Sequence, residues 1–198
     1  IILALICETC ENEAYNFNVY KEYSLFSGDK ELLTVNKNFC KQITRIEVKI
    51  KERGEKVYSF RIPEWCDGYI VELNEVATFF TINNGFIEIR GSFNESDLIV
   101  VAFKEKTELV VGTEYGGHTK RFAIRKGGIV YAADARFCDI NHVFSGNLKI
   151  EEIPEPDNVY KSVKVIDDKG IETILIDYSS AGKTWDDASK VSVWLNKD

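Results

Sequence analysis

The chain has 198 residues, 44% of them hydrophobic and 29% charged, a composition typical of a folded globular protein with one sizeable core. Its formal net charge of -7 argues against nucleic acid and anionic membrane surfaces as partners, because binding to phosphates requires clustered Lys and Arg. No apolar run approaches the roughly 20 residues of a membrane-spanning helix, so we expect no span across a bilayer.

The first periodic segment, residues 8–26, has an ambiguous pattern. Apolar and aromatic residues recur at steps of three and four, and Ser27-Gly28-Asp29 then supplies a helix stop. Against this, Tyr15, Phe17 and Val19 alternate with polar residues, as they would in a short strand. Because the segment is long, we predict one N-terminal helix.

The rest of the chain has the residue pattern of an all-β protein. Short runs rich in branched and aromatic residues are separated by Gly, Asn, Asp or charged turns, with no helical pattern of ten residues between them. The Asn83-Asn84-Gly85 triplet is typical of a hairpin turn. We therefore predict an antiparallel, jelly-roll-like β-sandwich. Its strands are expected at residues 32–35, 43–50, 57–62, 69–73, 78–82, 86–90, 98–103, 109–111, 121–125, 128–133, 160–166, 171–178 and 191–195.

The five cysteines, at positions 7, 10, 40, 66 and 138, form no dense framework, and their number is odd. This favours a reducing compartment such as the cytoplasm, or a metal site, over a disulfide scaffold. Secretion stays open if the apolar residues 1–7 end a signal peptide. Cys7 and Cys10 have the C-x-x-C spacing of a soft-metal chelate or a redox pair, but a single pair is only half of a structural zinc site.

Aromatic residues are the best candidates for contact with carbohydrate. Trp185 lies in a polar loop and could stack on a sugar face together with Tyr178, although it could equally cap the end of the sandwich. Trp65 and Trp194 are expected in the core. Neither histidine lies in a nucleophile motif, and we interpret His118 as a surface residue.

Several segments together resemble one family, the glycoside hydrolase family 127 proteins typified by bacterial beta-L-arabinofuranosidases. They occur in the family's order along its C-terminal β-sandwich region. The segments are Phe60-Arg61-Ile62-Pro63-Glu64-Trp65, the hairpin from Gly85 to Val100, Phe122 to Tyr131, and Asp177-Tyr178 through Trp185 to Leu195. The resemblance implies a sandwich domain over residues 35–198.

The N-terminus resembles a different part of the same family, its helical catalytic barrel. Glu8-Thr9-Cys10, a helical stretch and Ser27-Gly28-Asp29 are similar to a barrel segment in which the Glu and Cys are zinc ligands. The resemblance therefore implies zinc as the cofactor, with Glu8 and Cys10 as part of a metal site. The family's adjacent cysteine pair, which supplies a further ligand and the nucleophile, has no counterpart here. Residues 1–34 thus resemble a remnant of the barrel.

These features predict a non-catalytic accessory or structural module of a family 127-like protein that acts on arabinofuranosides or related plant glycans. No catalytic residue is assigned, and the chain is expected to be inactive alone. Its partners would be carbohydrate or a catalytic barrel domain. The alternative is a free-standing β-sandwich that binds carbohydrate or another protein through an aromatic face.

Overall fold

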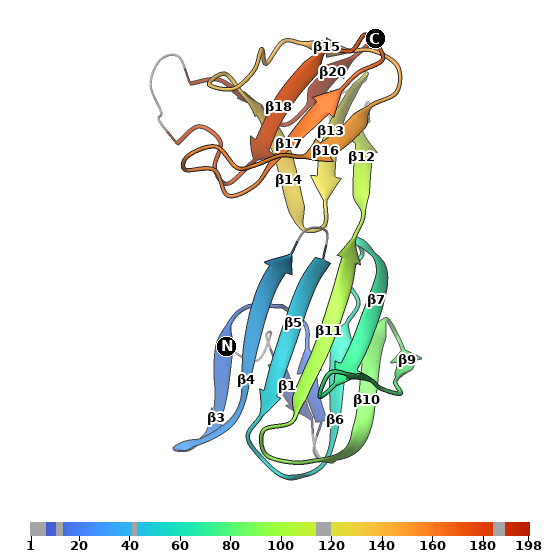
Figure 1. Ribbon diagram of the computed structural model, residues 1–198, viewed down its shortest axis with the longest axis vertical. Coiled ribbons are helices and arrows are strands. Elements are labelled where there is room, and N and C mark those ends of the chain that lie inside the picture. The colour runs from blue at the N-terminus through green and yellow to red at the C-terminus, as the bar shows by residue number, and fades with distance from the viewer. Residues whose placement is uncertain (1–6, 11–13, 41–42, 114–119, 184–188) are drawn as a thin grey trace. The chain divides into compact units, whose positions relative to one another are not determined.

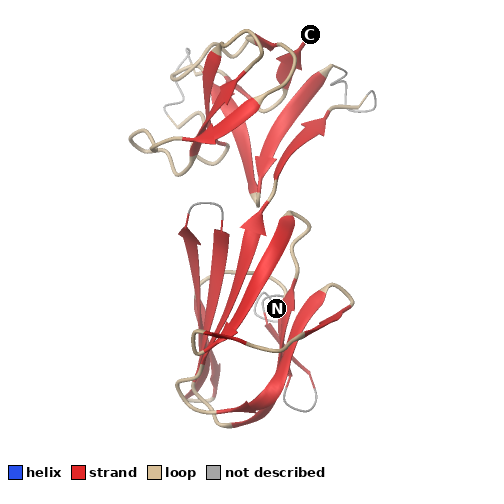
Figure 2. Ribbon diagram, turned by 45° about the vertical axis from the view of Figure 1, so that its right-hand side comes forward, coloured by secondary structure: helices blue, strands red, loops and turns tan. Residues whose placement is uncertain are grey.

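The protein is described by a computed structural model that covers residues 7–10, 14–40, 43–113, 120–183 and 189–198. Every regular element in these ranges is a β-strand, as Figure 2 shows, which confirms the all-β prediction. The chain divides into two compact units, Ile1–Glu105 and Lys106–Asp198, called unit 1 and unit 2 below. No helix in the described part is long and apolar enough to cross a membrane.

Unit 1 is a sandwich of two sheets. One has the strand order β1-β2-β6-β10-β9 and the other the order β3-β4-β5-β11-β7-β8, and every pairing within them is antiparallel except that of β2 with β6. The strands, labelled in Figure 1 where there is room, are β1 (Cys7–Cys10), β2 (Ala14–Phe17), β3 (Tyr23–Ser27), β4 (Lys30–Cys40), β5 (Ile43–Ile50), β6 (Gly54–Arg61), β7 (Cys66–Leu73), β8 (Val76–Ala77), β9 (Thr81–Asn83), β10 (Phe86–Phe93) and β11 (Leu98–Glu105).

The core of unit 1 follows from the alternation of buried and more exposed side chains along its strands. In β5, Ile46, Val48 and Ile50 are fully buried, while the residues between them are half-buried or exposed. Because successive side chains point to opposite faces, one apolar row per strand meets the matching row of the facing sheet. The predicted Asn83-Asn84-Gly85 turn is confirmed, since Asn84 and Gly85 have φ angles of 48° and 81° between β9 and β10.

The predicted N-terminal helix is wrong. Ala14–Phe17 forms β2, which pairs in parallel with β6, and Tyr23–Ser27 forms β3, which pairs with β4. Tyr15 and Phe17 are buried, and their rings stack on the β6 rings of Tyr58 and Phe60 with centroids 5.4 and 4.7 Å apart. Burial of two aromatic rings against a neighbouring strand outweighs the helical periodicity of the same segment.

Unit 2 is built on one nine-stranded system that folds over its own core. The strand order is β15-β20-β13-β14-β18-β17-β16, with β12 paired to β13 and β19 to β14. The strands are β12 (Thr107–Val111), β13 (Arg121–Lys126), β14 (Ile129–Asp134), β15 (Val143–Phe144), β16 (Lys149–Glu152), β17 (Ser162–Ile166), β18 (Glu172–Asp177), β19 (Val191–Ser192) and β20 (Leu195–Lys197).

An ion pair shows that this sheet curls. Lys126 in β13 donates to the carboxylate of Glu152 in β16, although three strands separate β13 from β16 in the sheet order. The β16 end of the sheet therefore folds back toward β13, and Ile124, Val163 and Leu175 belong to one buried core cluster.

Residues 34 and 35, at the domain boundary expected from the sequence, both lie within β4 of unit 1. The division between compact units falls at Glu105 and Lys106, where β11 ends shortly before β12 begins.

Candidate functional site

Tyr178 lies directly after β18, in unit 2, with 60% of its surface exposed. Its backbone N–H donates to the carbonyl of Val130 at 2.9 Å, so the residue is attached to β14. Two shallow hollows, of about 290 and 460 Å³, both have Tyr178 and Ser179 in their linings. Tyr178 therefore belongs to the wall of both hollows.

A second exposed tyrosine lines the smaller hollow. Tyr160 is 52% exposed, and the Lys161 ammonium lies 6.0 Å from its ring centroid. Tyr160 follows the acidic loop after β16, so it reaches this place from a distant part of the sequence. Two exposed rings, each with an apolar face and a polar tip, suit the stacking and hydrogen-bonding needs of a sugar.

The carboxylate of Asp177 fixes the backbone beneath these rings. It is 2% exposed and accepts hydrogen bonds from the N–H groups of Tyr160, Lys161 and Ser180 at 3.0 to 3.1 Å, and from the Ser179 hydroxyl. Burial by itself would raise the pKa of this carboxyl group, but these donors together lower it. Asp177 thereby ties the segment before β17 to the turn that carries Tyr178.

A second buried carboxylate, Asp134 at the end of β14, secures the other side of the turn. It accepts from Arg136 Nε at 2.9 Å and Nη2 at 2.7 Å, and from the Gly182 N–H at 2.8 Å. The Arg136 guanidinium is the main reason that the pKa of Asp134 falls to about 2. Arg136 also donates to the carbonyl of Ser180 at 3.0 Å, so both ends of the turn are held.

These carboxylates position the backbone and are poor candidates for acid catalysis. A general acid in glycoside hydrolysis needs a raised pKa so that it carries a proton near neutral pH. Every carboxyl group with a resolved pKa shift in the described part is instead shifted downward. These groups are Glu31, Glu88, Glu108, Asp134, Glu151, Glu155, Asp167, Asp177 and Asp198.

The structure describes the other predicted site residues only in part. Glu8 and Cys10 lie in β1, whose backbone pairs them with Asn16 and Ala14 of β2, but their side chains are not described. Trp185 lies outside the described residues. No group of three or more His, Cys, Asp or Glu side chains that could hold a metal occurs in the described part, which leaves out the side chains of Glu8 and Cys10.

Sequence reasoning missed Tyr160, Asp134 and Asp177. Their residue types are ordinary for loops and strand ends, and no local motif brings positions 134, 160 and 177 together. The His142 ring packs beside the Phe144 ring, with the two ring centroids 4.6 Å apart. His142 Nε2 lies 3.4 Å from Asp167 Oδ2. Trp65 packs against the core of unit 1, as predicted.

Comparison with known proteins identifies the fold. No protein-family model and no curated protein matches the sequence. Among solved structures, the chain is similar to a GH127 beta-L-arabinofuranosidase from Geobacillus stearothermophilus T6, with a TM-score of 0.74 and 17% identity over 100% of this chain. It is also similar to a GH127 beta-arabinofuranosidase (TM-score 0.73, 19% identity, 96% of this chain) and to a glycoside hydrolase (TM-score 0.69, 14% identity, 92% of this chain).

The match covers only part of those proteins. This chain spans 35% of the Geobacillus chain and 36% of each of the other two. The two β-sheet units thus share the fold of about a third of these longer glycoside hydrolases.

Proposed function

We propose that this chain is a non-catalytic β-sandwich module of a glycoside hydrolase that resembles family 127 and acts on arabinofuranosides or related plant glycans. The observation that carries this proposal is the similarity of fold, which extends over 92 to 100% of this chain and over about a third of proteins described as GH127 arabinofuranosidases or a glycoside hydrolase. Its partners would be the glycan and a helical catalytic domain.

The metal ligands and nucleophile that the resemblance requires are incomplete in this chain, which argues against catalysis by this chain alone. Resemblance implies zinc, which would be held by Glu8 and Cys10 together with an adjacent cysteine pair that also provides the nucleophile. The sequence contains no adjacent cysteines, so the nucleophile and one ligand have no counterpart. The residues present do not complete a zinc-thiolate site, and we derive no catalytic step through the metal.

The proposal is tested by measuring activity and zinc content together. The purified chain is incubated with an aryl beta-L-arabinofuranoside, with and without added zinc, and its bound zinc is measured after dialysis. We expect no turnover above that of the Cys10→Ser variant. Turnover by the original chain with stoichiometric zinc, lost in the Cys10→Ser variant, would overturn the proposal.

A second candidate function is direct binding of carbohydrate, and it is favoured by the exposed rings of Tyr160 and Tyr178 beside the two hollows. Arabino-oligosaccharides are titrated into the chain and followed by calorimetry. The Tyr178→Ala variant should lose most of the affinity, because stacking on an aromatic ring contributes on the order of 1 kcal/mol or more.

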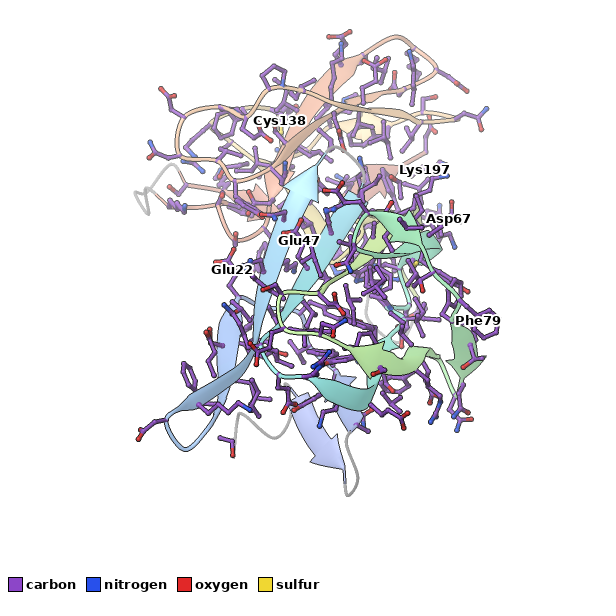
Figure 3. All side chains as sticks on the ribbon, turned by 60° about the horizontal axis from the view of Figure 1, so that its bottom comes forward. Glu22, Glu47, Asp67, Phe79, Cys138 and Lys197 are labelled. Atoms are coloured by element: carbon purple, nitrogen blue, oxygen red, sulfur yellow. The ribbon has the colours of Figure 1, made fainter. Side chains whose placement is uncertain are left out.

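Phe79→Ala is the matched control for this experiment. Phe79 is 84% exposed and projects from unit 1, where Figure 3 labels it, so its removal also deletes an exposed ring. Equal loss of affinity in both variants, or no loss in Tyr178→Ala, would exclude a specific site at Tyr178.

A further inference from the structure

A third hollow of unit 2 lies at the open edge of its core. It has a volume of about 370 Å³ and is lined by residues of β12, β13 and β20 and the positions next to them. Its apolar floor has a simple origin in the strand register. Val111 of β12 lies opposite Phe122 of β13, and Leu109 lies opposite Ile124.

Paired residues in neighbouring strands share a face, so Leu109 and Val111 lie on the core side of the sheet. Phe122 and Ile124 are 3% and 0% exposed, as core residues should be, yet Leu109 and Val111 are 43% and 71% exposed. The described residues therefore cover the inner face of β12 only in part. The result is an apolar floor that is open to a ligand.

The rim of this hollow is positively charged. Lys120, Arg121 and Lys197 line it, and none of the three has an ion-pair partner among the described residues. Figure 3 labels Lys197, which ends β20. The one carboxylate in the lining, that of Asp198, is directed to Lys169 at 3.5 Å and to the Ser145 hydroxyl.

Among the described residues of the lining, three cations outnumber the single acidic residue, Asp198, in a chain whose net charge is -7. An excess of like charge around a hollow lowers the free energy of a bound anion. The planar guanidinium of Arg121 suits a carboxylate in particular, because it can donate two parallel hydrogen bonds. The volume lies near the lower end of the range of about 300 to 1,000 Å³ for small-molecule pockets.

We propose that this hollow binds a sugar acid, with the carboxylate held by Lys120, Arg121 and Lys197 and the apolar face of the ring against Leu109, Val111 and Phe122. The preference for an anion follows from the charges alone. The choice of a sugar rests on the proposed function.

The experiment measures the affinity of the whole chain for three probes, namely a galacturonic acid disaccharide, its neutral methyl ester and a sugar phosphate. The acid should bind more tightly than the other two, and its affinity should fall as salt is added. Charge reversal in Arg121→Glu or Lys197→Glu should weaken binding of the acid by about tenfold, because an attraction is replaced by a repulsion.

Lys30→Glu is the matched control, since it makes the same change of net charge at an exposed lysine of unit 1 with no ion-pair partner in the described part. Its affinity for the acid should equal that of the original chain. Circular dichroism of each variant verifies that the β-structure is retained.

Several results would overturn the inference. They are equal binding of acid and ester, tighter binding of the sugar phosphate than of the acid, or equal losses in Lys30→Glu and Arg121→Glu. The test is separable from that of the proposed function. Binding of neutral arabino-oligosaccharides that depends on Tyr178, without binding of the galacturonic acid probe, would refute only the inference made here.

Discussion

Asp134 offers a quantitative test of how the turn that carries Tyr178 is held. The Asp134 carboxylate is 2% exposed and has its pKa lowered from 3.8 to about 2, chiefly by hydrogen bonds from Arg136. A depression of this size corresponds to about 2 kcal/mol of unfolding free energy. Because the pKa is lower in the folded chain, this contribution is fully present above about pH 5 and is lost as the pH falls toward 2.

The Asp134→Asn variant removes the charge and leaves an amide whose N–H₂ group cannot accept the hydrogen bonds donated by Arg136 and Gly182. We expect its free energy of unfolding near pH 7 to be lower by about 2 to 4 kcal/mol. Near pH 3 only about half of the ionic contribution remains in the original chain, so the difference between the two proteins should shrink by about 1 kcal/mol.

Native-state hydrogen exchange of the amides in β17 and β18 measures this quantity for unit 2 alone. The control is Asp157→Asn, which neutralises an exposed carboxylate in the same unit and should change the free energy by less than about 0.5 kcal/mol. An Asp134→Asn effect of the same size near pH 7 and near pH 3 would refute the assignment of this stability to the ionised carboxylate.

Three further predictions concern packing and reactivity. Phe17→Ala should destabilise unit 1 by about 3 to 5 kcal/mol in urea unfolding, because the ring is fully buried, whereas Phe79→Ala at an 84% exposed ring should cost less than about 0.5 kcal/mol. Equal effects would contradict the placement of β2. Gly146→Ala should lower the thermal unfolding midpoint, because φ is +63° and the new Cβ would lie 1.9 Å from Asp168 Oδ2; an unchanged midpoint would show that this turn relaxes freely. Burial raises the pKa of the Cys66 thiol, so alkylation at neutral pH should be slower in the folded chain than in urea, and equal rates would argue against its burial.

The strands were largely predictable because alternation is a local property. The range 43–50 coincides with β5, and its apolar residues Ile46, Val48 and Ile50 are buried, whereas Ile43 at the start of the strand is 37% exposed. The N-terminal segment was mispredicted because Tyr15 and Phe17 fit two periodicities at once. Only the presence of β6 beside it, with Tyr58 and Phe60 available for stacking, selects the strand.

The residues of the candidate site were likewise predictable from the sequence only in part. Tyr178 could be selected from the sequence as a candidate for contact with sugar, which stays a prediction, and 60% of its surface is exposed. Tyr160 could not, because it reaches the same hollow only through the pairing of β17 with β18. The buried carboxylates of Asp134 and Asp177 were equally unpredictable, since an aspartate at a strand end is ordinarily solvated.

By itself the sequence determined which face of β2, β5 and β10 is buried, because side chains alternate with a period of two and the apolar residues of these strands follow that period. The tertiary structure decided which strands are neighbours. The parallel pairing of β2 with β6, the contact of Lys126 with Glu152 and the convergence of Lys120, Arg121 and Lys197 all join residues that are far apart in the chain or in the sheet order. Such juxtapositions depend on the free energy of the whole packed core, which no local pattern of residues encodes.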